Sequence, residues 1–234
     1  MKKFLKFLFC VILIAISIGL LFVGNGYKMY QEAIEAVPLE EKIAQINETP
    51  NYTTLEELPQ MYINAVISVE DHRFYGHPGI DIIAIGRALI NDIKAMSFVE
   101  GGSTITQQLA KNVYFTQEKK IERKIAEVFM AFQIENNLEK NEILELYLNT
   151  SYFGDGYHTP KEAARGYFNK ELEELTDGEC IMLAGIPNAP SVYAPTKNWD
   201  LAKQRQKQVA NKMVEYGYLT QNEAEKIISE NISV

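Results

Sequence analysis

An uncharged apolar run constrains this 234-residue chain more than any other feature of its sequence. Residues 7–23 carry no charge, and Lys2, Lys3 and Lys6 precede them. At about 1.5 Å of rise per residue, the run comes close to the ~30 Å hydrocarbon core of a bilayer. The segment therefore suits a single membrane-spanning helix.

Two other interpretations of this run are open, a cleaved signal peptide and a buried core helix. A signal peptide has a shorter apolar core of about 7–15 residues and a small-x-small cleavage site, and residues 18–30 offer no convincing site. A core helix would be apolar on one face only, whereas this run is apolar all round. We favour an uncleaved anchor with the N-terminus in the cytoplasm and the chain from about residue 26 outside, because positive charges stay inside.

The sequence then divides into three parts. Residues 1–25 are expected to form a cytoplasmic stub and the transmembrane anchor. Residues 26–55 are polar, with Pro38 and Pro50 as breaks, and predict a membrane-proximal connector with one short helix. Residues 56–234 predict one all-α domain of about eight to ten helices.

Apolar spacings of three and four residues support the all-α prediction. One such stripe consists of Ile82, Ile85, Leu89, Ile93 and Met96. Similar stripes lie within 105–113 and 121–132, and no convincing strand pattern competes. Thr176 with Glu179 and Thr220 with Glu223 have the spacing of capping boxes at helix starts.

Charge and cysteine content exclude some classes of function. The formal net charge of −8 argues against nucleic acid as a main partner, because affinity for a polyanion needs an excess of Lys and Arg. An anionic ligand would have to be held by a local basic cluster. Cys10 lies in the membrane run and Cys180 in the exported domain, so a disulfide between them is not expected.

Three stretches carry residues suited to chemistry, and the first is 69–81. Glu70 follows the apolar residues Ile63, Val66 and Ile67, so it should project from the end of a buried helix. Partial desolvation there suits a carboxylate for general-base catalysis. The alternative is an ordinary helix end with solvated acids.

The second stretch, 100–112, starts with two glycines, after which Ser103 or Thr104 can cap a helix. Gln107, Gln108 and Lys111 are expected on the polar side of that helix. Free N–H groups at a helix start bind anions, and a lysine adds a movable charge. A capped amphipathic helix without a ligand is the alternative.

The third stretch, 119–128, places Lys120, Lys124 and Glu127 on one helix face and pairs Arg123 with Glu127 at i,i+4. It is either a solvated, salt-bridged face or a phosphate site. His72, His77 and His158 lack the spacing of a tetrahedral metal site. Neither Ser-x-x-Lys nor Lys-Thr-Gly occurs, so no penicillin-sensitive transpeptidase is indicated.

In order, these stretches resemble the glycosyltransferase family 51 domain of peptidoglycan polymerases. The similarity rests on Glu70-Asp71-x-x-Phe74-x-x-His77-x-Gly79-x-Asp81, Gly102-Ser103-Thr104-Ile105-Thr106-Gln107-Gln108-Leu109-x-Lys111-Asn112, Arg123-Lys124-x-x-Glu127, Glu142-Ile143-Leu144-Glu145-x-Tyr147-Leu148-Asn149 with Tyr152-Phe153-Gly154, and Leu183-Ala184-Gly185-Ile186-Pro187-x-Ala189-Pro190-Ser191. The resemblance implies a lysozyme-like all-α fold with two lobes around a cleft, the smaller lobe embedded in the membrane.

The resemblance also implies roles. Glu70 would take the proton from the acceptor's 4-hydroxyl, which attacks C1 of the donor sugar with inversion and expels undecaprenyl pyrophosphate. Glu127 matches a second essential carboxylate, which either holds Mg²⁺ or Mn²⁺ or orients Lys124 and Arg123; no organic cofactor is implied. The residues expected to bind the substrate or its pyrophosphate are Lys111, Lys124, Arg123, Lys119, Gln108, Ser103, Thr104 and Asp71.

The partners implied are lipid II, the growing undecaprenyl-linked glycan strand and the membrane, with a separate transpeptidase for crosslinking because the chain resembles the monofunctional type. Met96, Phe98 and Val99 lie in the segment that resembles a mobile, membrane-dipping region, although core contacts are equally compatible.

The sequence departs from the family pattern at two places. His158-Thr159-Pro160 replaces a usual Tyr-Gly-Ile and puts the local turn in doubt, and Lys119 stands where Arg is common.

Two other functions remain open at this point. A lytic enzyme of the lysozyme-like fold would use a single acidic catalyst and would not need the basic residues between Lys111 and Lys124. A non-catalytic scaffold that binds a lipid-linked precursor is favoured only by the change at residues 158–160.

Overall fold

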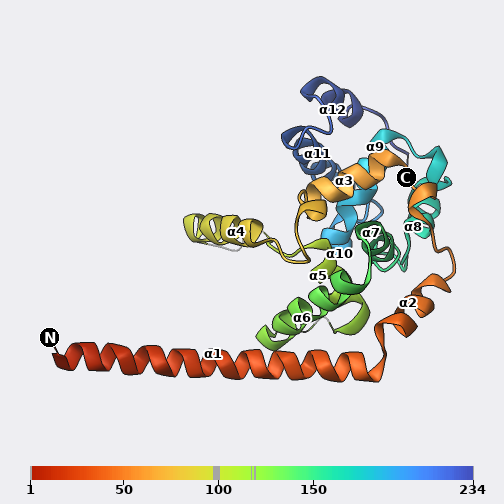
Figure 1. Ribbon diagram of the computed structural model, residues 1–234. Helices are drawn as coiled ribbons and strands as arrows, with labels where there is room; N and C mark the ends of the chain where they lie inside the picture. Colours follow the sequence, from red (N-terminus) through yellow and green to blue (C-terminus); the bar gives the residue numbers. More distant parts are fainter. Residues whose placement is uncertain (1, 97–100, 117, 119, 234) are drawn as a thin grey trace.

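A computed structural model describes residues 2–96, 101–116, 118 and 120–233, and every regular element within these ranges is helical (Figure 1). The all-α prediction is thus confirmed. The α-helices are α1 (Lys2–Ala36), α2 (Leu39–Asn47), α3 (Gln60–Glu70), α4 (Ile82–Ala95), α5 (Ile105–Tyr114), α6 (Ile121–Asn137), α7 (Lys140–Leu148), α8 (Pro160–Phe168), α9 (Asp177–Gly185), α10 (Pro190–Tyr193), α11 (Trp199–Glu215) and α12 (Gln221–Ile228). Short 3₁₀ helices lie at Leu55–Glu57, Phe74–Gly76, Leu172–Glu174 and Ile186–Asn188.

Helix α1 is long and apolar enough to cross a membrane, but it does not end with the apolar run. It continues to Ala36, into the segment expected to be a connector, and Pro38 separates it from α2. The extension packs along α6, where the rings of Tyr27 and Phe129 meet edge to face at 5.1 Å. This packing stabilises a helix that the polar composition of the segment alone did not indicate.

The core positions the C-terminal end of α3. Helix α9 is buried from Gly178 to Gly185, and α3 packs against both this helix and α11. Tyr62, Ala65 and Val66 of α3 are almost inaccessible to solvent. Because this helix is fixed on several sides, its last residue, Glu70, has a defined position.

Helix α4 forms where the apolar spacing predicted it, yet its apolar face contacts no core. It projects away from the rest of the domain, toward the side on which the N-terminal end of α1 also projects (Figure 1). The exposed apolar side chains are Ile82, Ile83, Ile85, Leu89, Ile90, Ile93 and Met96. Met96 is 93% exposed, so a core contact there is excluded, whereas Phe98 and Val99 lie outside the described residues.

The unusual His158-Thr159-Pro160 segment leaves the preceding turn intact. Gly154 and Gly156 have φ angles of +87° and +88°, and the N–H of Tyr157 donates to the carbonyl of Gly154 at 2.9 Å. Thr159 then caps α8, and Pro160 occupies the first turn, where its missing N–H costs no hydrogen bond. The capping boxes predicted at Thr176 and Thr220 are also present.

Candidate active site

A cleft with a volume of about 1040 Å³ lies between two groups of helices. The end of α3 and the helix α11 line one side, and α4, α5 and α6 line the other. The predicted site residues that line it are Glu70, Asp71, Ser103, Thr104, Gln108, Lys111, Lys124 and Glu127. Arg123 does not line the cleft, but it forms an ion pair with Glu127, which does. Lys119 lies outside the described residues.

Glu70 presents one occupied and one free oxygen to the cleft. Its side chain is only 10% exposed, and Oε2 accepts a hydrogen bond from Nε2 of Gln108 at 2.7 Å. Oε1 has no hydrogen-bond partner among the described residues, and Nη2 of Arg205 lies 3.8 Å from it. An ionised carboxylate held in this way can accept a proton from an incoming hydroxyl.

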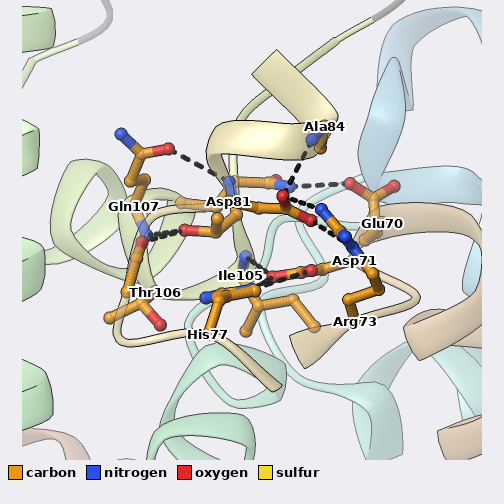
Figure 2. A network of polar contacts seen from close by, with 12 residues as sticks. Glu70, Asp71, Arg73, His77, Asp81, Ala84, Ile105, Thr106 and Gln107 are labelled. Atoms are coloured by element: carbon orange, nitrogen blue, oxygen red, sulfur yellow. Dashed lines mark hydrogen bonds and ion pairs between the residues drawn. The ribbon is translucent and has the colours of Figure 1, made fainter. Parts of the chain in front are cut away.

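Behind Glu70, buried polar groups pin the loop between α3 and α4 onto the start of α5 (Figure 2). The carboxylate of Asp71 accepts hydrogen bonds from the N–H of Ile105 at 3.0 Å and from Nε2 of His77 at 2.9 Å. Asp81 pairs with Arg73 and caps α4. Both aspartates are buried, so these are not the solvated acids of an ordinary helix end.

Asp71, His77 and Asp81 also bring ligand atoms within 4.8 Å of one another, as a metal site would. Each carboxylate oxygen of Asp71 and Asp81, however, already accepts a hydrogen bond from His77, Ile105, Arg73 or Ala84. The guanidinium of Arg73, which pairs with Asp81, would repel a cation at this position. The residues therefore fit an ion-pair network and do not fit a resident divalent cation.

Thr104, not Ser103, caps helix α5. Its Oγ1 accepts from the N–H of Gln107 at 3.1 Å and donates to the carbonyl of Gly79 at 2.6 Å. The side chain of Gln107 folds back to the N–H of Thr104 and is buried, although it lines the cleft on the same side of the helix as Gln108 and Lys111. Ser103 is left free to accept from Nζ of Lys124 at 2.6 Å, which links the starts of α5 and α6.

The basic residues gather around Glu127. One oxygen of this 2% exposed carboxylate pairs with Arg123, and the other lies 3.0 Å from Nζ of Lys124. The pKa of Lys111 is lowered, first by burial and then by the charges of Arg123 and Lys124, with Glu127 and Glu70 opposing the shift. Two cations thus share one carboxylate on the α5–α6 side of the cleft, and Lys111 lies near enough to be influenced by its charge.

Helix α11 contributes residues that the sequence did not single out. Arg205 is 13% exposed, and besides facing Glu70 its Nε donates to the carbonyl of Gly185 at 3.3 Å. At the end of the helix, Tyr216 stacks on His72 with centroids 4.0 Å apart and an interplanar angle of 6°. Burial, followed by the charges of Arg87 and Arg73, lowers the pKa of His72. Arg205 lies in an ordinary amphipathic helix and Tyr216 directly after it, and no local spacing marks either residue.

Similarity to known proteins shows which family the chain belongs to. A family profile described as Transglycosylase matches residues 39–214, so the chain belongs to the transglycosylase family, as its motifs predicted. It is 46% identical over 171 residues to penicillin-binding protein 1F of Bacillus subtilis (strain 168), covering 73% of this chain and 24% of that protein.

Two further similarities concern proteins named penicillin-binding protein 1A. The protein from Aquifex aeolicus (strain VF5) is 42% identical over 183 residues, 78% of this chain and 25% of its own length. A crystal structure of the Haemophilus influenzae protein aligns with a TM-score of 0.47 and 23% identity, covering 77% of this chain and 17% of that one. The chain therefore spans about a quarter of the length of the curated relatives it matches.

Proposed function

We propose that this chain is a peptidoglycan glycosyltransferase that polymerises lipid II, with Glu70 as the general base. The observation that carries the proposal is the free Oε1 of a buried, ion-paired Glu70 at the wall of a large cleft. This oxygen takes the proton of the acceptor's 4-hydroxyl, whose oxygen attacks C1 of the donor sugar from the face opposite the leaving group. The anomeric centre is inverted and undecaprenyl pyrophosphate departs.

The basic cluster supplies the second half of the reaction. A pyrophosphate already carries negative charge, so it needs cations as it leaves more than it needs a proton. Lys111, Lys124 and Arg123 offer these cations, and Ser103 adds a hydroxyl beside Lys124. Because both oxygens of Glu127 already bind cations, we assign it the orientation of Arg123 and Lys124, and not the binding of Mg²⁺ or Mn²⁺.

Membrane attachment brings the cleft to a lipid-linked substrate. One apolar N-terminal helix supports a membrane-anchored protein. We propose that the N-terminus lies in the cytoplasm, because Lys2, Lys3 and Lys6 precede the span, and that the catalytic domain lies outside. The exposed apolar face of α4 would then enter the outer leaflet, where lipid II and the growing strand are anchored. Crosslinking of the strands falls to a separate transpeptidase.

The test uses the detergent-solubilised protein, its Glu70→Gln variant and a Glu173→Gln control on the exposed surface, each incubated with purified lipid II. Separation of the products by size should show long glycan strands from the native and control proteins and none from Glu70→Gln. No strands from any of the three, with lipid II still bound, would favour the scaffold.

A lytic enzyme is tested with the same proteins on finished glycan. Charge reversal at Lys124 should abolish polymer formation, because the leaving pyrophosphate loses a cation. If Lys124→Glu instead leaves a glycan-cleaving activity intact while the native protein makes no strands, the lytic function is correct.

A further inference from the structure

Gln108 lies between Glu70 and a buried tyrosine. Its Nε2 donates to Oε2 of Glu70 at 2.7 Å, and its Oε1 accepts from the hydroxyl of Tyr147 at 3.4 Å. The three side chains come from α3, α5 and α7, so the chain of hydrogen bonds joins elements that are far apart in sequence. Tyr147 is 2% exposed and therefore has no competing contact with bulk water.

The hydroxyl of Tyr147 donates to the amide oxygen of Gln108. Burial, and then the negative charge of Glu70, raise the pKa of Tyr147 well above its usual value, so the hydroxyl keeps its proton at any working pH. A primary amide has one donating and one accepting end. If the amide of Gln108 turned over, its oxygen would face the carboxylate of Glu70, and two acceptors would oppose each other.

We propose that Tyr147 is a positioning residue for the base: its hydroxyl fixes the orientation of Gln108, and Gln108 in turn holds Glu70 with Oε1 directed at the acceptor hydroxyl. This inference rests on the proposed role of Glu70. Sequence similarity alone treats Gln108 as a ligand for the substrate, whereas its contacts make it a link between Tyr147 and the base.

Other groups also face Glu70 and limit how large the effect can be. Arg205 approaches from α11 and Lys111 from α5, while the neighbouring Asp71 is already saturated by Ile105 and His77. All of these remain when the hydroxyl of Tyr147 is removed. The expected effect is consequently a shift in the pH dependence of the reaction and not its loss.

The experiment compares Tyr147→Phe with Tyr62→Phe. Tyr62 is a matched control, because it is also fully buried and its hydroxyl has no hydrogen-bond partner among the described residues. With lipid II as substrate, kcat is measured across the whole acid limb of its pH profile and up to pH 9. A carboxylate that loses a well-oriented donor is less stable in its charged form, so the acid limb of the Tyr147→Phe profile should move up by about half a pH unit.

Gln108→Leu should move the acid limb in the same direction, and the double variant should shift it no further than Gln108→Leu alone, because Tyr147 acts only through Gln108. A Tyr147→Phe profile that overlays the native one, or additive shifts in the double variant, would overturn the proposal. Equal shifts in Tyr62→Phe would do the same.

A second readout does not depend on catalysis. Protein labelled with ¹⁵N at glutamine gives side-chain amide signals, and that of Gln108 is identified by its loss in Gln108→Leu. In the native protein this signal should titrate with a neighbouring carboxylate, and Tyr147→Phe should displace it while Tyr62→Phe does not. An unmoved signal refutes the inference, whereas a moved signal without glycan synthesis confirms the contact and refutes the proposed function.

Discussion

Replacing Gly26 with alanine is expected to push helix α1 away from α6. A Cβ at this position would lie 2.6 Å from both Cβ and Cγ2 of Ile125 and 2.9 Å from the backbone oxygen of Glu122. Carbon atoms in contact prefer about 3.5–4.0 Å, so the two helices must part by roughly 1 Å. Ile125 cannot move aside easily, because its Cβ is fixed to the backbone of α6.

Gly24 supplies the control, because a Cβ there meets nothing within 4 Å. Both Gly→Ala changes gain about 1 kcal/mol of helix propensity, which cancels in the comparison. Overpacking costs about 1–3 kcal/mol, and this cost falls on Gly26→Ala alone. At about 2–4 °C per kcal/mol for a chain of this size, Gly26→Ala should melt about 2–12 °C below Gly24→Ala.

The assay is thermal unfolding of both variants in the same detergent, followed by glycan synthesis at a permissive temperature. Helix α6 carries Arg123, Lys124 and Glu127, so displacing it should also weaken substrate binding in Gly26→Ala. Equal melting temperatures and equal activities would show that the close approach of α1 and α6 at Gly26 limits neither stability nor substrate binding, and would refute this reasoning.

Three further predictions follow from single contacts. Lys111 is a cation only below its pKa, which burial lowers from the ordinary 10.5. Native activity should therefore begin to fall at a pH lower than this ordinary value as the medium becomes alkaline, and Lys111→Arg should move the fall to higher pH. Identical alkaline limbs in the two pH profiles would contradict the prediction. If Glu127 orients cations and holds no metal, EDTA should change the rates of the native protein and of Glu127→Gln by the same factor. An effect of EDTA on the native protein alone would instead show that Glu127 binds a metal ion. Thr159→Ala removes the cap of α8 and should lower the free energy of unfolding by about 1 kcal/mol in a urea titration, with glycan synthesis retained. A loss of synthesis at unchanged stability would instead show that residues 158–160 take part in the reaction.

The sequence predicted the helices well because their apolar spacing is local. The stripe of α4 identifies a helix, but periodicity is the same whether the face meets a core or a lipid, and only the structure reveals that Ile82 and Met96 are exposed. The same limit applies to Ser103 and Thr104, since both can cap a helix. Thr104 caps α5 because its hydroxyl also donates a hydrogen bond to the carbonyl of Gly79, which is 25 residues away in the sequence.

The site was predicted in part. Glu70, Lys111, Lys124 and Glu127 were found through similarity to a family, since neither spacing nor charge brings α3 and α6 to one cleft. Arg205 was not predicted as a site residue, because a single arginine on an amphipathic helix is normally solvated. Its importance arises only from the packing of α11 against α3.

In the membrane-anchored arrangement proposed above, the uninterrupted α1 gives the cleft a fixed height above the bilayer. Its 35 residues span about 52 Å, of which about 30 Å lies in hydrocarbon, so roughly 20 Å of rigid rod stands in the aqueous layer with α6 attached to its flank. A flexible tether would let the cleft wander, whereas this stalk holds it at one distance from the bilayer. Each residue added to the rod would raise the cleft by about 1.5 Å and rotate it by about 100° around the membrane normal. In the proposed arrangement, the length of α1 therefore sets the distance between the cleft and the bilayer.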